Sequence, residues 1–113
     1  MAFTISNQGN VGLLTLKGKF LGSIDGPEVK AGVQQLKEEG QTKLVVDLSK
    51  TDFMDSSGIG VLISALKTMR EAGGDVVLAG MEKRIKNIFL MTKLLVNVFE
   101  NYDNAEDAAA SLA

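Results

Sequence analysis

Two short, largely apolar runs rich in valine and leucine, at residues 43–48 and 75–79, constrain this chain more than any other feature. Their apolar character is continuous rather than alternating, so each is predicted to be a buried strand of a parallel sheet. Parallel strands need a long crossover, and apolar residues recur at helical spacing between the runs until Gly-Gly at 73–74 ends the pattern. We expect a helix over about residues 57–72, with an apolar face of Ile59, Leu62, Ile63, Leu66 and Met69.

The N-terminal third predicts a hairpin followed by a helix. Short apolar strands near residues 3–5 and 11–16 flank a turn-forming segment at 7–10. Residues 25–28, Asp-Gly-Pro-Glu, combine an acidic residue with an early proline, which suits a helix start. The helix is expected to end at Gly40, and its buried face is expected to contain Val29, Val33 and Leu36.

The C-terminal third continues the alternation with a helix, a strand at residues 96–99 and a closing helix. The predicted order is β-β-α-β-α-β-α-β-α. The first two strands are joined too tightly for a crossover, so the α/β fold should have a mixed, mostly parallel sheet with helices packed against it. No linker or repeat divides the 113 residues, so we expect one domain over residues 1–113. Apolar residues at helical spacing predict the two helices: Ile85, Ile88 and Phe89 in the first, and Ala105, Ala108, Ala109 and Leu112 in the second.

Cysteine and histidine are both absent, which removes most catalytic chemistry. The chain therefore has no disulfide framework, no Cys nucleophile, no Ser-His-Asp triad and no Cys/His zinc site. Carboxylate sites for Mg²⁺ or Ca²⁺ are chemically allowed, but no spacing supports one. A net charge of −2 offers no field that would gather nucleic acid. With neither a secretory signal nor an apolar stretch long enough for a membrane span, we expect a cytoplasmic protein without membrane insertion.

The segment after the strand at 43–48 is the most informative one. Loops at the carboxyl ends of strands carry function in such sheets, and this loop is expected to run over residues 49–60. Ser56 or Ser57 should cap the following helix with its hydroxyl. A phosphate here would accept several backbone N–H bonds at the positive helix end, and the neighbouring Asp55 would repel its charge. The alternative is ordinary helix capping without any switch.

Residues 52–62, Asp-Phe-Met-Asp-Ser-Ser-Gly-Ile-Gly-Val-Leu, resemble the signature of bacterial anti-sigma factor antagonists of the STAS domain family. The resemblance extends with good spacing over about residues 42–112 and is weaker before that. It implies that the serine preceding the glycine, Ser57, is phosphorylated by a partner that is both kinase and anti-sigma factor. The implied partner-binding residues are Asp25, Asp55, Ser56, Ser57, Gly58 and Ile59.

The resemblance also implies a mechanism. The unphosphorylated protein would bind the ATP-bearing anti-sigma kinase and displace the sigma factor, and phosphate on Ser57 would abolish binding. A PP2C-type phosphatase would restore it, and the metal would belong to that phosphatase. The protein would then be a binding module and kinase substrate rather than an enzyme, with no cofactor or metal of its own, and a monomer or weak dimer.

Two places depart from the family pattern. In the loop after the second strand, the family has the pattern Gly-x-apolar-Asp. Residues 22–25 fit this pattern, but residues 18–21 could align with the same place and lack the aspartate. The loop at 17–26 is therefore expected to be several residues longer than usual, and Asp25 could equally be a helix N-cap or first-turn acid. Residues 92–94, Thr-Lys-Leu, lack the helix-ending glycine of the family.

Other residues allow two interpretations. The cations Lys83, Arg84 and Lys86 could form a partner-binding edge, but the charged outer face of an amphipathic helix is favoured. At the turn before the second helix, Phe53 and Met54 could anchor a partner, and at least one of them is expected in the core.

Two other function classes stay open. One is a constitutive STAS subunit, either of a lipid-transport ABC complex or of a signalling scaffold. The other is an Mg²⁺ enzyme that uses the carboxylates Asp47, Asp52 and Asp55, which is the weakest of the three hypotheses.

Overall fold

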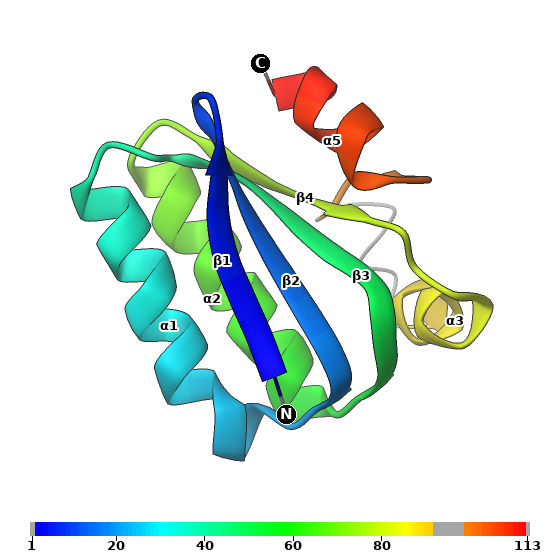
Figure 1. The fold of residues 1–113 in the computed structure, drawn as a ribbon. Coiled ribbons are helices and arrows are strands. Elements are labelled where there is room, and N and C mark those ends of the chain that lie inside the picture. Colours follow the sequence, from blue (N-terminus) through cyan, green and yellow to red (C-terminus); the bar gives the residue numbers. More distant parts are fainter. Residues whose placement is uncertain (1, 92–98, 113) are drawn as a thin grey trace.

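The computed structural model describes residues 2–91 and 99–112 and contains a single five-stranded sheet (Figure 1). The strands lie in chain order, with an antiparallel β1–β2 hairpin and parallel pairing from β2 to β5. The predicted mixed, mostly parallel sheet and the order of elements are therefore confirmed. The strands are β1 (Ala2–Gln8), β2 (Val11–Phe20), β3 (Lys43–Met54), β4 (Asp75–Ala79) and β5 (Asn101–Tyr102).

Helices cover both faces of this sheet. The apolar faces of three of them enter one core together with alternate residues of the strands, such as Leu44, Val46 and Leu48 of β3. A smaller core on the opposite face joins Val45 and Val77 to the C-terminal helix. Both strands in the middle of the sheet are thus buried on both sides, as their continuous apolar character predicts. The helices are α1 (Gly22–Glu38), α2 (Ser56–Glu71), α3 (Lys83–Met91) and α5 (Ala105–Leu112).

The strand pair β2–β3 extends much further than the sequence predicts. Pairing continues to Phe20 opposite Met54, across two register shifts at each of which β3 has one residue more than β2. Gly18 lies beside one shift with φ of 74°, and the buried Thr51 hydroxyl donates to the carbonyl of Leu16 at 2.8 Å. The Thr51 bond gives the Leu16 carbonyl a partner where the β2–β3 pairing is irregular. The predictions of a loop at 49–60 and of a long loop at 17–26 are therefore wrong.

Single residues replace both predicted loops. Leu21 separates β2 from α1, and Asp55 separates β3 from α2. Helix α1 begins at Gly22, earlier than the predicted start at residues 25–28, so Pro27 lies inside the helix rather than at its first position. Because proline has no N–H, α1 lacks the hydrogen bond that residue 27 would otherwise donate to the carbonyl of residue 23.

The last strand that the structure describes lies at residues 101–102, whereas the sequence predicts one at residues 96–99. Residues 96–98 are outside the described part of the chain, as are residues 92–94, where the helix-ending glycine of the family is replaced. Phe99 is buried but not in a strand, and its ring meets Phe89 edge to face at 6.0 Å between centroids. The strand is the two-residue β5, which pairs with Leu78 and Ala79.

Candidate functional site

The turn between β3 and α2 is organised by the carboxylate of Asp55. This residue is the N-cap of α2, and its Oδ1 accepts hydrogen bonds from the N–H of Gly58 at 2.6 Å and of Gly22 at 3.1 Å. Its own N–H donates to the carbonyl of Phe20 at 3.3 Å. One side chain therefore satisfies donors at the starts of two helices, where N–H groups lack intrahelical partners.

The start of α1 lies directly against this turn. Its N-cap, Leu21, makes no side-chain cap, and Asp25 instead reaches back so that its Oδ2 accepts from the Leu21 N–H at 3.2 Å. Asp25 is therefore a first-turn acid, the structural alternative that the sequence left open. Its carboxylate also lies favourably at the positive end of the helix dipole.

Glycines allow the two helix starts to approach this closely. A Cβ at Gly22 would overlap the main chain of Ser57, and one at Gly58 would lie 2.9 Å from the carbonyl of Phe20. One at Gly26 would lie 2.8 Å from a methyl of Val61. The helices thus meet backbone to backbone, which fixes the position of the Ser57 main chain relative to α1.

Two serines stand exposed on this rigid turn. Ser56 and Ser57 are the first two residues of α2, and the structure gives neither hydroxyl a hydrogen bond to the described part of the chain. The prediction that a serine hydroxyl caps the helix is wrong, because the Asp55 carboxylate holds that position. The Ser57 hydroxyl is consequently not committed to capping.

A phosphate on Ser57 would enter a field with two opposing parts. The helix start favours negative charge, whereas the Asp55 carboxylate two residues away opposes it. The Gly58 N–H already binds Asp55 at 2.6 Å, so a phosphate would have to compete for that donor or use other N–H groups of the first turn.

The predicted partner-binding residues are brought together, but not all of them face solvent. Ser56 and Ser57 are exposed, Asp55 is half-buried, and Gly58 is buried. Ile59 is 8% exposed and packs in the larger core, so it holds the helix start in place. Asp25 is half-buried on the neighbouring helix.

Sequence reasoning missed one neighbour of this turn, Gly22, and left a second, Phe53, open as a partner anchor or a core residue. Gly22 was assigned only to a loop pattern, and no local signal shows that its N–H binds a carboxylate 33 positions later. Phe53 is 41% exposed, whereas Met54 is 2% exposed and belongs to the core, as expected for at least one of the pair. Neighbouring residues of a strand point to opposite faces, which explains why Phe53 and Met54 differ in exposure.

Neither a metal cluster nor a membrane span is found in the described residues. Within residues 2–91 and 99–112, no group of three or more acidic side chains could hold a metal ion. No helix in the same ranges has the length and apolarity to cross a membrane.

A family model described as "STAS domain" matches residues 3–108. Among curated proteins, the anti-sigma-B factor antagonist of Listeria monocytogenes is 33% identical over 68 residues, or 60% of each chain. The chain thus spans 60% of the length of this relative.

Solved structures share the fold. An anti-sigma factor antagonist from Mycobacterium paratuberculosis superposes with a TM-score of 0.84 at 17% identity, covering 98% of this chain and 92% of that one. SpoIIAA of Bacillus in its phosphorylated form gives a TM-score of 0.77 at 18% identity, covering 99% and 100%. An unphosphorylated form of SpoIIAA has also been solved.

Proposed function

Because this chain belongs to the STAS domain family, we propose that it is an anti-sigma factor antagonist switched by phosphorylation of Ser57. In its unphosphorylated form it binds an ATP-loaded anti-sigma factor with serine kinase activity and so releases the sigma factor. Phosphorylation ends this binding, and a PP2C-type phosphatase restores it. The protein acts as a binding module and substrate in the cytoplasm, not as an enzyme.

The observation that carries the proposal is the exposed Ser57 hydroxyl on a turn whose backbone is held from two sides. Asp55 fixes the start of α2, and Gly22 of α1 packs against the Ser57 main chain. A kinase needs an accessible hydroxyl in a defined position, and this turn provides one at little further cost in ordering.

Two comparisons support the switch. Curated relatives include anti-sigma-B factor antagonists, and a protein of the same fold, SpoIIAA, occurs in phosphorylated and unphosphorylated forms.

The physical effect of the phosphate follows from its charge. It adds about −1.5 to −2 charges to a surface that already carries Asp55, and it must be desolvated for a partner to pack there. Binding through this turn is therefore lost without any need for the fold to change.

The test uses purified protein, the anti-sigma factor kinase encoded in the same genome, and ATP. We expect phosphate on Ser57 by peptide mass spectrometry, and loss of the binary complex after modification. Ser57→Ala should abolish phosphate incorporation and keep binding, whereas Ser57→Asp should weaken binding.

Ser56→Ala is the matched control, since it removes an exposed hydroxyl from the adjacent position of the same helix. It should leave both phosphorylation and binding intact. Phosphate on Ser57→Ala protein, or a modified protein that still binds as tightly as before, contradicts the proposed switch.

A further inference from the structure

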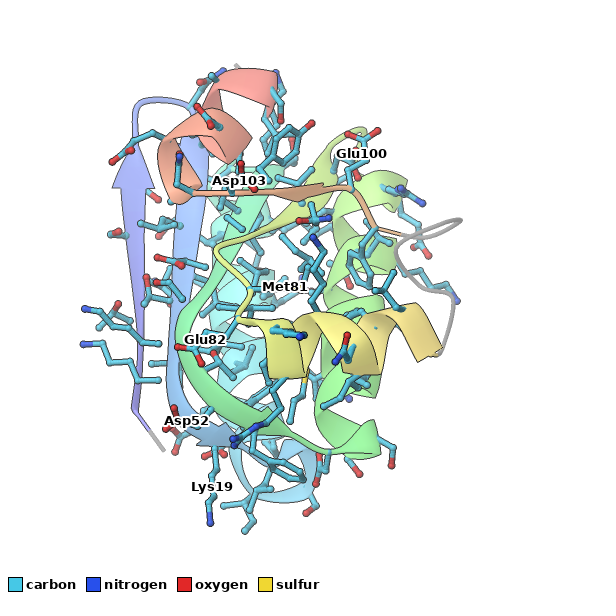
Figure 2. All side chains as sticks on the ribbon, turned by 90° about the vertical axis from the view of Figure 1, so that its right-hand side faces the viewer. Lys19, Asp52, Met81, Glu82, Glu100 and Asp103 are labelled. Atoms are coloured by element: carbon cyan, nitrogen blue, oxygen red, sulfur yellow. The ribbon has the colours of Figure 1, made fainter. Side chains whose placement is uncertain are left out.

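A shallow groove of about 380 Å³ lies at the end of the sheet where β2 and β3 finish. Its lining residues come from the β2 end and the residue after it, from the β3 end, and from the first turn of α3: Lys19, Leu21, Asp52, Phe53 and Arg84. Figure 2 shows Lys19 and Asp52 close together at this edge of the molecule. The groove contains neither serine of the α2 turn.

The register of β2 and β3 explains why this groove faces away from α1 and α2. Phe20 pairs with Met54, and both side chains are buried in the larger core. The preceding pair, Lys19 with Phe53, must therefore point to the opposite side of the strand pair. Phe53 stays 41% exposed there, although a folded chain gains by burying an aromatic ring.

The charges of the groove are unbalanced. Lys19 and Arg84 are exposed, and neither makes an ion pair within the described part of the chain. Lys83 and Arg84 occupy the first turn of α3, which contains no acidic residue, although the helix dipole disfavours cations at that end. Asp52 within the groove and Glu82 just before α3 offset part of this positive charge.

Taken together, these features describe a surface for a protein segment. An exposed aromatic ring beside Leu21 offers an apolar contact of the kind that anchors protein interfaces. The two cations beside it attract carboxylates and raise the rate of encounter with an acidic partner. Helix stability does not account for the position of Arg84, since a basic residue there weakens the first turn.

We propose that this groove docks an acidic segment of the anti-sigma factor, with an apolar side chain against Phe53 and carboxylates at Lys19 and Arg84. The inference rests on the proposed function and deepens it. Phe53 lies near the end of β3, two residues before Asp55, the N-cap of α2. One partner can therefore contact the groove and the serine turn together. Because the groove lies outside the α2 turn, its contribution to affinity is the same whether or not Ser57 is phosphorylated.

The experiment measures the Kd for the ATP-loaded anti-sigma factor kinase of the same genome, at low and at high salt. Arg84→Glu, Lys19→Glu and Phe53→Ser are each expected to weaken binding about tenfold or more, and the charge reversals should lose most of their effect at high salt. Lys86→Glu is the matched control: it reverses an exposed cation of the same helix outside the groove, and should change the Kd less than about twofold.

A second measurement separates docking from the switch. In a Ser57→Asp background, Arg84→Glu should weaken the residual binding by the same factor as in the wild-type background. Circular dichroism melting checks that each variant is folded. If Phe53→Ser destabilises the end of the strand, the conclusion is drawn from Arg84→Glu and Lys19→Glu alone.

The outcomes distinguish the two proposals. If wild-type protein binds and is phosphorylated on Ser57 while both folded charge reversals behave like Lys86→Glu, the groove proposal is overturned and the proposed function stands. If the wild-type protein binds no anti-sigma factor kinase, the proposed function fails and the docking proposal fails with it.

Discussion

The two helix starts that meet at the candidate site are built in opposite ways. Helix α2 has its own cap, with Asp55 immediately before it and a 2.6 Å bond to Gly58. Helix α1 has no side-chain cap at Leu21, and the N–H of Gly22 is satisfied by the cap of the other helix. The start of α2 is therefore self-sufficient, whereas the start of α1 depends on α2.

This difference shows what kind of surface the site is. A serine on a flexible loop would be positioned by local sequence alone, but here the main chain of Ser57 is held by a contact between distant segments. The order of the serine turn and the order of α1 are thus coupled through Asp55 and Gly22. Substitutions at the start of α1 should therefore disturb the serine turn, although they lie more than 30 residues away in the sequence.

Gly22→Ala is expected to have the largest effect. The added Cβ would overlap the main chain of Ser57, and neither backbone can move without breaking its cap. We expect a loss of about 3 kcal/mol in the free energy of unfolding, measured by urea denaturation, together with weaker partner binding. A stability equal to that of the wild type would show that the helix starts are not held together.

Asp55→Ala comes next, because it removes the acceptor for both Gly58 and Gly22. We expect a loss of about 2 kcal/mol in the same urea measurement, from one missing cap and one further unsatisfied N–H. Asp55→Ser keeps a capping oxygen for Gly58 but reaches less far, so it should recover about half of the loss. Full recovery by serine would mean that the bond to Gly22 contributes nothing.

Asp25→Ala affects only the dependent helix. It loses a 3.2 Å bond to the Leu21 N–H and a favourable charge at the helix end. The expected cost is about 1 kcal/mol, and it should fall at high salt because part of it is electrostatic. Amide exchange should speed up in the first turn of α1 and not in that of α2. Equal acceleration of amide exchange in both helices would show that Asp25 also stabilises the start of α2.

Gly60→Ala should act in the other direction and have the smallest effect. Its Cβ would meet nothing within 4 Å, and the residue lies exposed inside α2. Removing glycine flexibility from a helix should stabilise the protein by about 0.5 kcal/mol. This variant is the control for Gly22→Ala, because it makes the same chemical change without the close contact. A destabilised Gly60→Ala would indicate that close packing is not specific to Gly22.

The sequence predicted the fold where the signal extended over several residues. The buried runs in β3 and β4 are continuously apolar, and the apolar face of α2 repeats at helical spacing, so the residues alone predict their type and order. The two-residue β5 is too short to give such a signal, and most of the predicted strand, residues 96–98, lies outside the described part of the chain. The extension of β3 to Met54 depends on register shifts and on the bond of Thr51 to Leu16 in another strand.

The candidate site was predictable only in its contiguous part. Asp55, Ser56 and Ser57 are all good capping residues, so composition could not show which of them caps α2. The carboxylate does so, and the hydroxyls remain available. The role of Gly22 could not be identified, and the choice between partner anchor and core residue could not be made for Phe53, since both depend on segments that meet only in the folded chain.

The bond between Gly22 and Asp55 joins residues 33 positions apart, so the Ser57 surface exists only when α1, β3 and the start of α2 have come together. A kinase that recognises this surface would ignore a nascent or unfolded chain, as well as a short peptide around Ser57. Phosphorylation at Ser57 would then be restricted to correctly folded molecules. Misfolded molecules would stay unphosphorylated and would be open to proteolysis.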